Sequence, residues 1–546
     1  MELTINQKKV VFEQQITLEE IAKTLNLENV LAAKVDGRLR ELTYYINKDA
    51  DIDFLGMNEP DGIKVYESTL RYVVAMAIHQ LFPHVRLKFS YSISRAILAT
   101  FENYKHMITP TIVTQINQEV NRIVSEDYKI ERHKISLDKA IELYHSFGME
   151  DKVDILKYRE EKDVNYYACN DYINYMFGYM LPSTGYLKKF KMFVYYPGFI
   201  IQYPRAELNG NIPEFIEEPS FGKALKDSAK WGKVIDGNTL AKINRYAENK
   251  KSATDFVSMC ESKHSHMLHE LGDQIEFNID SIKLICIAGP SSSGKTTFSN
   301  RLRIELLSRG IHPVMISIDD YYLGKQFAPK DDFGQPDLEH VQALDLELFN
   351  HDMSSLIQGE TITLPKFNFK TGLREKGQTV HLKEDTPIII EGIHALNEQL
   401  TYSIPKHQKY KIYISPQTQL HIDDLNPISI TELRLLRRIV RDQKYRNSSA
   451  ADTMKMWANV RKGEFKWIYP FQNEADYIFN SELTYELAVL KKHAISQLLE
   501  IDHDNVYFIT ANRLLKFLKY IKDIDDDLVP NHSLLREFIG DSCFNY

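Results

Sequence analysis

One short stretch of this sequence, GPSSSGKT from Gly289 to Thr296, constrains the fold more than any other. It fits the pattern GxxxxGK[ST], follows the apolar run IKLICIA, and precedes a stretch of helical spacing, TTFSNRLRIELLSR. A buried strand, a glycine-rich loop and a helix, in that order, direct backbone N–H groups and a helix dipole at an anion. The sequence therefore predicts a phosphate-binding loop, in which Lys295 reaches the terminal phosphates of a nucleotide and the Thr296 hydroxyl holds Mg²⁺.

The apolar runs after this loop predict a parallel sheet with helices on both faces, because PVMISI, TPIIIEGI and YKIYIS are separated by helical stretches. Asp319 and Asp320 follow the first of these runs, and Glu391 ends PIIIE in the second. The carboxyl ends of parallel strands line the ligand crevice of an open α/β sheet. We expect Asp319 to accept a proton from an attacking hydroxyl and Glu391 to orient Mg²⁺. Helix capping is the alternative role for the two aspartates.

A dense arginine group follows in RLLRRIVRDQKYR, where helical spacing places several guanidinium groups on one face. Fixed guanidinium groups beside a transferring phosphoryl group would stabilise its charge. A solvated helix face is the alternative. The arginines are Arg434, Arg437, Arg438, Arg441 and Arg446.

Together these motifs resemble the uridine kinase and phosphoribulokinase family of P-loop kinases, over about residues 282–492. The motifs appear in the order GPSSSGKTT, SIDDYY, the PD of QPDLEH, LPKFNF, EGIHAL and RRIVRDQKYR. The resemblance implies that ATP, with Mg²⁺, phosphorylates a sugar hydroxyl, which is the 5′-hydroxyl if the substrate is a nucleoside. The ATP-binding residues that it implies are Gly289, Pro290, Ser291, Ser292, Ser293, Gly294, Lys295, Thr296 and Thr297.

The resemblance also implies roles for residues on the acceptor side. Asp319 is similar to the family's catalytic base, acting with Lys295, and Asp337 to the aspartate that holds the ribose hydroxyls. Gly372 stands where uridine kinases carry a base-reading histidine, which leaves the base preference open, and Arg374 is one candidate to replace it. The implied substrate-binding residues are Tyr322, Asp337, Phe367, Arg374, Arg438 and Arg441, and Arg446 is the lid arginine.

The first 220 residues resemble the two amino-terminal domains of threonyl-tRNA synthetase, through YESTLRYVVAMAIHQLFP and MFGYMLPSTGYLKKFKM. The pair Asp36–Gly37 predicts a hairpin turn, and Thr17 with Glu20 predicts a capping box before a helix, as in a ubiquitin-like β-grasp. In the synthetase family the second domain carries four metal ligands. The aligned positions here are Glu67, Arg71, Met176 and Met180, so no zinc is expected. RNA contact by these domains stands as the alternative to simple packing or homo-oligomerisation.

The expected fold class is α/β: a P-loop kinase with a parallel sheet and helices on both faces, preceded by a β-grasp domain and an α+β domain similar to the synthetase editing domain. The length of 546 residues accommodates several domains. The boundaries that we expect are 1–62 for a TGS-like β-grasp, 63–221 for the editing-like domain with a degenerate metal site, 222–275 for a helical linker, 276–500 for the kinase and 501–546 for a helical extension.

The composition excludes some classes of binding partner and cellular compartment. The formal charge of −8 excludes a generally basic nucleic-acid coat, and the four dispersed cysteines favour a reducing, cytoplasmic compartment over a disulfide framework. No apolar run reaches the roughly 20 residues of a membrane span. The leading hypothesis is a nucleoside kinase. Its alternatives are a kinase of another small hydroxylated metabolite, similar to phosphoribulokinase or pantothenate kinase, and an RNA-associated P-loop NTPase or sensor.

Overall fold

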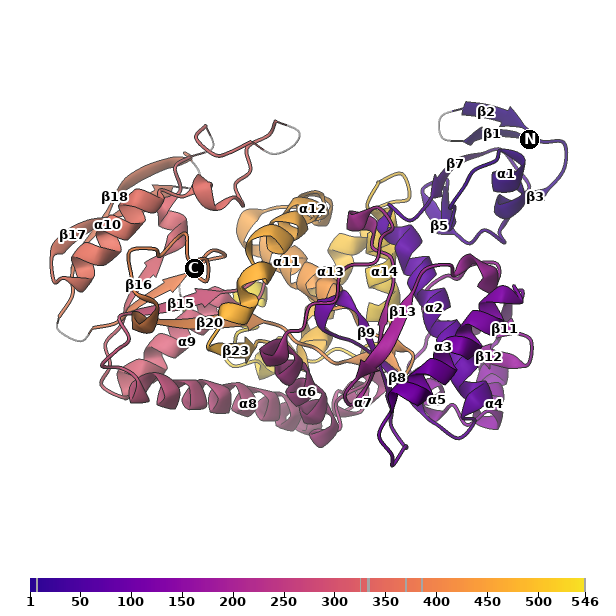
Figure 1. Cartoon of the computed structure of the whole chain (residues 1–546), viewed down its shortest axis with the longest axis horizontal. Helices are drawn as coiled ribbons and strands as arrows, with labels where there is room; N and C mark the ends of the chain where they lie inside the picture. Colours follow the sequence, from indigo (N-terminus) through magenta and orange to yellow (C-terminus); the bar gives the residue numbers. More distant parts are fainter. Residues whose placement is uncertain (6–7, 325, 331–333, 369–370, 384–385, 545–546) are drawn as a thin grey trace.

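The computed structural model describes residues 1–546 apart from 6–7, 325, 331–333, 369–370, 384–385 and 545–546. Residues 1–221 lie on one side of the molecule and a parallel sheet on the other, with helices of the carboxy-terminal third between them (Figure 1). None of the helices in the described part of the chain has the length and apolar character that a bilayer crossing requires.

The first body is the expected β-grasp, a mixed five-stranded sheet with helix α1 (Leu18–Thr24) packed on it. The capping box of Thr17 and Glu20 is confirmed, and Asp36–Gly37 forms the turn between β4 and β5 with both residues at positive φ. In sheet order the strands are β2 (Lys8–Val11), β1 (Glu2–Ile5), β7 (Ala50–Leu55), β4 (Ala32–Val35) and β5 (Arg38–Arg40), and a separate pair is β3 (Ile16–Thr17) with β6 (Tyr45–Ile46).

The second body is α+β and is organised around one long helix, α2 (Pro60–Leu81), whose residues from Ile63 to Ile78 are buried apart from the half-buried Lys64. An antiparallel sheet is formed by β13 (Lys191–Tyr195), β14 (Gly198–Gln202), β9 (Ile97–Phe101) and β8 (Leu87–Tyr91). The remaining elements are β10 (Glu131–Ser136), β11 (Asp163–Cys169), β12 (Tyr172–Asn174), α3 (Pro110–Ser125), α4 (Leu137–Ser146) and α5 (Glu150–Leu156).

The third body contains the parallel sheet that the apolar runs predict. Its order is β16 (Val314–Ser317), β19 (Ile388–Glu391), β15 (Leu284–Ala288), β20 (Lys409–Ser415) and β23 (Tyr477–Asn480), and every neighbouring pair is parallel. All residues of β15 and β20 are buried, as a sheet covered on both faces requires. The strand that carries the phosphate loop, β15, is therefore the central one.

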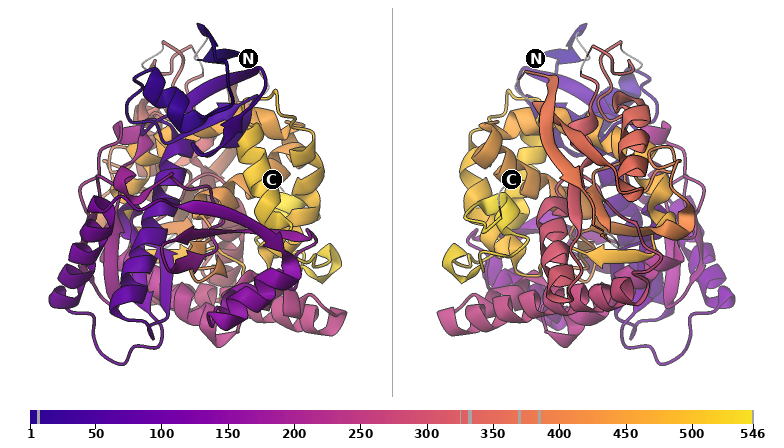
Figure 2. Two further views of the ribbon diagram at one scale, coloured as in Figure 1. Left: turned by 90° about the vertical axis from the view of Figure 1, so that its right-hand side faces the viewer. Right: turned by 90° about the vertical axis from the view of Figure 1, so that its left-hand side faces the viewer.

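Helices and two hairpins surround this sheet. Long α8 runs along one edge of the molecule and packs on α9 (Figures 1 and 2). The hairpins are β17 (Thr361–Asn368) with β18 (Leu373–His381), and β21 (His421–Asp423) with β22 (Asn426–Pro427). The helices are α6 (Pro219–Val234), α7 (Leu240–Tyr246), α8 (Lys250–Phe277), α9 (Lys295–Ser308), α10 (Leu346–Ile357), α11 (Ile430–Arg446), α12 (Ala450–Trp467), α13 (Glu486–Leu499), α14 (Phe508–Leu518) and α15 (Arg536–Ile539).

The hairpin β21–β22 joins the third body to the front half (residues 1–221). Buried Lys152 lies 3.3 Å from Asp151 and 3.4 Å from Asp423 of the hairpin, and the Arg86 guanidinium pairs with Asp424 at 2.5 Å. His421 also contacts the carbonyl oxygen of Phe89, at 2.8 Å. Ion pairs therefore cross this contact, one of them buried between Lys152 and Asp423 and one more exposed between Arg86 and Asp424.

Of the four positions aligned with the synthetase metal ligands, Arg71 contacts the same hairpin. Arg71 pairs with Glu67 at 3.5 Å and donates to the carbonyl oxygen of Leu425, while Met176 and Met180 are buried in the apolar core. No group of three His, Cys, Asp or Glu side chains suited to a metal occurs among the residues that the structure describes. The cationic Arg71 thus acts here as a partner of the hairpin backbone.

We predict that Lys152→Ala lowers the free energy of unfolding by about 3–5 kcal/mol, because it leaves two carboxylates buried without their cation. Urea denaturation followed by circular dichroism measures the change. Lys129→Ala is the matched control, since Lys129 forms an exposed pair with Glu131, and its loss should cost about 1 kcal/mol or less. Equal effects of the two substitutions would contradict a structural role for the buried pair.

Candidate functional site

The phosphate loop (residues 289–296) has the strand–loop–helix geometry that the motif predicts. It leaves the central strand β15 at Ala288 and enters α9 at Lys295, with Gly294 at the helix N-cap at φ 89°. The hydroxyls of Ser292 and Ser293 are buried and have no hydrogen-bond partner in the described part of the chain. Lys295 Nζ turns back to the loop carbonyls of Gly289 and Pro290, at 3.1 and 3.4 Å. The two unpartnered hydroxyls and the nearby ammonium group fit a phosphate ligand.

Carboxylates gather beside the loop at the carboxyl ends of the strands. Glu391 ends β19 and is in register with Ile287 of β15 and with Ser317 of β16, the strand that leads to Asp319. Burial raises the pKa of Glu391 to about 7, against the attraction of Lys295, and nearby Asp319 adds to the rise. Burial also raises the pKa of Asp319, while Lys295 and Arg446 oppose that rise.

This chemistry suits a divalent cation. Hard oxygen ligands bind Mg²⁺, which keeps several waters and needs only one or two protein groups besides the phosphates. Glu391 and the Thr296 hydroxyl at the start of α9 are the groups that would hold it. The raised pKa of Glu391 reflects a carboxylate whose charge lacks sufficient compensation from the protein alone.

Two arginines of α11 donate hydrogen bonds to backbone carbonyl groups of the loop. Arg434 donates to the carbonyl oxygen of Ser291 at 3.0 Å and pairs with Glu464, whereas Arg437 donates to that of Ser292 at 3.3 Å and pairs with Glu486. Both side chains are at most 2% exposed. Of the five arginines that the sequence singles out, these two thus fix the loop backbone.

The other three arginines form a cationic cluster around a single carboxylate, that of Asp442. Arg441 lies 2.8 Å from it, Arg438 3.1 Å and Arg446 3.6 Å. Arg438 also donates to the Ser291 hydroxyl of the loop at 2.7 Å. Three positive charges share one negative charge beside the loop, so this cluster can accept a further anion such as a phosphate.

The predicted acceptor-side residues lie along β17 and the segment before it. The rings of Tyr322 and Phe367 are 5.7 Å apart, and the backbone N–H of Phe367 donates to Asp320 at 3.1 Å. Asp337 accepts from the backbone N–H of Glu339 at 3.1 Å. Arg374 lies opposite Phe367 on β18 and pairs with Asp345 at 2.9 Å, so its guanidinium already has a carboxylate partner.

The structure adds two acidic residues that the sequence reasoning missed. Burial raises the pKa of Glu339 to about 7, and the charges of Arg438, Asp319 and Lys295 all act on this carboxyl. Glu339 belongs to the quoted motif QPDLEH, which was its only sequence signal. The second is Glu537, which contacts Thr297 across 240 residues of chain and has no local signal at all.

These features define the carboxy-terminal body as a P-loop kinase domain. Residues 284–488, less than half of the chain, match the model of the Phosphoribulokinase / Uridine kinase family. Among solved structures, one described as that of a "Possible Uridine Kinase" from Bacillus stearothermophilus is 21% identical, with a TM-score of 0.25, and the match covers 38% of this chain and 99% of that one.

The front half is similar to threonine–tRNA ligases. The ligase of Caldanaerobacter subterraneus subsp. tengcongensis is 26% identical over 243 residues, which are 41% of this chain and 37% of the ligase. That of Clostridioides difficile is 29% identical over 185 residues, 33% of this chain and 29% of the ligase. The chain spans about a third of the length of these curated relatives.

We predict that Glu391→Gln stabilises the protein more at about pH 8 than at about pH 5. The pKa of Glu391 is about 7 in the folded chain and ordinarily 4.5, so the folded state holds this proton more tightly. The carboxyl therefore costs stability progressively as the pH rises from about 4.5 to about 7.

Free energies of unfolding in urea at the two pH values measure the effect. Glu13→Gln, at an exposed position of the front half, controls for the chemical change itself. If Glu391→Gln changed the free energy of unfolding equally at both pH values, the ionisation of Glu391 would not be unfavourable in the folded protein.

Proposed function

We propose that this protein is an ATP- and Mg²⁺-dependent kinase that transfers the γ-phosphoryl group of ATP to the 5′-hydroxyl of a ribonucleoside. One observation carries the proposal. Asp319 directly follows β16, which is separated from the phosphate loop strand β15 by β19 alone, and the positive charges of Lys295 and Arg446 act on its carboxyl group. A base beside the loop can reach a hydroxyl that attacks a phosphate held there.

The proposed step is an in-line displacement. The acceptor hydroxyl loses its proton to the Asp319 carboxylate as its oxygen bonds to the γ-phosphorus, and the bond from that phosphorus to the β,γ-bridging oxygen breaks, leaving ADP. Lys295 and the cluster of Arg438, Arg441 and Arg446 stabilise the charge of the transferring group. Mg²⁺ supplies further neutralisation of the phosphates when bound.

A ribonucleoside fits the residues on the acceptor side. The Asp337 carboxylate can accept two vicinal hydroxyls, which selects a ribose, and the paired rings of Tyr322 and Phe367 offer a stacking surface for a base. Gly372 offers no side chain to a base edge, and Arg374 is engaged by Asp345. We therefore propose that the enzyme tolerates more than one base, because discrimination requires buried polar groups that the wrong base leaves unpaired.

A panel of ribonucleosides, 2′-deoxyribonucleosides, sugar phosphates and pantothenate with labelled ATP tests this proposal. We expect transfer to ribonucleosides, with more than one base accepted and 2′-deoxy analogues used less well. Transfer to a sugar phosphate or to pantothenate alone would show that the enzyme is a kinase of another small hydroxylated metabolite and not of nucleosides. ATP hydrolysis that RNA stimulates, without a phosphorylated small molecule, would identify an RNA-dependent NTPase.

We predict that Asp319→Asn lowers kcat by about 10²–10⁴-fold, the range for loss of a general base, and leaves the affinity for ATP nearly unchanged. Steady-state kinetics with the preferred acceptor and equilibrium binding of ATP separate the two effects. The adjacent Asp320→Asn is the matched control, because an amide oxygen can still accept from the Phe367 N–H. Equal losses in the two variants would remove Asp319 from the role of base.

A further inference from the structure

We propose that residues 530–541 form an autoinhibitory latch that occupies the nucleotide site and must move away before ATP binds. This segment contains α15 and follows the short turn Asp526–Leu528. It adds no strand to the parallel sheet, so the sheet can persist when it leaves. The inference rests on the proposed function, in that the occupied site is taken to be the site of ATP.

The first observation is the position of the Glu537 carboxylate. The backbone N–H and the hydroxyl of Thr297 both donate to Glu537 Oε2, at 3.1 and 2.9 Å. Thr297 lies in the first turn of α9, directly after Lys295 and Thr296, where helix N–H groups lack partners within the helix. The positive end of a helix binds phosphates and carboxylates alike. Glu537 thus holds donors that a nucleotide phosphate at this loop requires.

The second observation is that an apolar side chain closes the loop itself. A Cβ atom placed on Gly294 would lie 2.4 Å from Leu534 Cδ2, so Leu534 rests directly against the N-cap of α9. Glu537 follows Leu534 by three residues, and both side chains come from one turn of the chain. The segment therefore covers the loop with an apolar group while it places an anion on the helix end.

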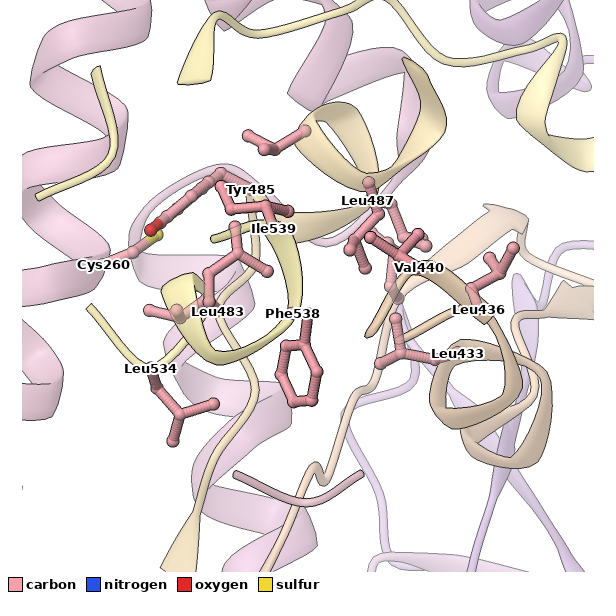
Figure 3. Close-up of a cluster of buried hydrophobic side chains, with 14 of the residues drawn as sticks. Cys260, Leu433, Leu436, Val440, Leu483, Tyr485, Leu487, Leu534, Phe538 and Ile539 are labelled. Carbon is pink, nitrogen blue, oxygen red and sulfur yellow. The ribbon is translucent and has the colours of Figure 1, made fainter. Parts of the chain in front are cut away.

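The third observation is the body of the segment, which is packed between α11 and the chain that follows β23 (Figure 3). Phe538 is fully buried, and the Arg437 guanidinium lies 5.1 Å from the centre of its ring. The labelled neighbours of the segment in Figure 3 are Cys260, Leu433, Leu436, Val440, Leu483, Tyr485 and Leu487.

Electrostatics indicate that ATP and Glu537 exclude each other. The Glu537 carboxylate already accepts from the backbone N–H and the hydroxyl of Thr297. The phosphates of ATP would bring further negative charge to the same donors, and like charges at such distances repel strongly where water is excluded. A segment that competes with ATP for the site weakens the apparent affinity for ATP. The apparent affinity equals the intrinsic affinity multiplied by the fraction of molecules in which the segment is released.

Isothermal titration of the full-length protein with Mg²⁺ and ATP tests the latch. Glu537→Gln keeps the shape of the side chain and removes its charge, and we expect it to tighten ATP binding by about fivefold or more. Asp541→Asn is the matched control, because it removes one charge from the same segment at a side chain that is 84% exposed. We expect the affinity of this control to equal that of the unaltered protein.

Hydrogen exchange on the unaltered protein provides a second measurement that needs no substitution. We expect saturating ATP to speed exchange of the backbone amides in residues 533–540. ATP binding of equal strength in the unaltered protein and Glu537→Gln, with these amides still protected, would overturn the latch and leave the kinase proposal intact. Absence of ATP binding in the unaltered protein, in Glu537→Gln and in the double variant Leu534→Ala/Glu537→Gln would overturn both.

Discussion

The N–H groups in the first turn of α9, which have no acceptor within the helix, are the constraint around which the carboxy-terminal body is arranged. A helix beginning at Lys295 leaves these donors facing the phosphate loop, where only an anion satisfies them well. Behind the loop, Arg434 and Arg437 hold the carbonyl groups of Ser291 and Ser292, which fixes the backbone that presents the donors. The cationic cluster and the acidic residues at the strand ends lie beside the loop, so an anion and a cation can both be bound there.

The front half is linked to this position through one continuous stretch of chain. Strand β20 leads into the hairpin β21–β22, which is seated against the front half, and the hairpin leads directly into α11 with its arginines. At the start of α11, Glu432 pairs with Lys64 of α2 at 2.5 Å and with Arg513 of α14 at 2.6 Å. The synthetase-like front half can thus set the placement of the helix that supports the loop.

Local sequence signals predicted the elements, and long-range partners decided what the side chains do. The loop, the apolar character of each strand, the Asp36–Gly37 turn and the Thr17 capping box depend on neighbours within a few residues, so the sequence alone revealed them. Arg434 and Arg438 have the same chemistry on the same helix, yet Glu464 fixes one behind the loop while the other joins the cluster around Asp442. The contact between Thr297 and Glu537 spans 240 residues, and no spacing rule reaches that far.

The acidic residues of the site affect one another's ionisation. Glu391 and Glu339 both have a pKa near 7 because burial disfavours their charged forms and neighbouring carboxylates add repulsion. Departure of Glu537 removes one of the negative charges that act on Glu391, and arrival of a cation at Glu391 and Thr296 favours ionisation further. Both events reduce the uncompensated negative charge beside the phosphate loop. A chain with a net charge of −8 can therefore gather cations locally beside an anion-binding loop.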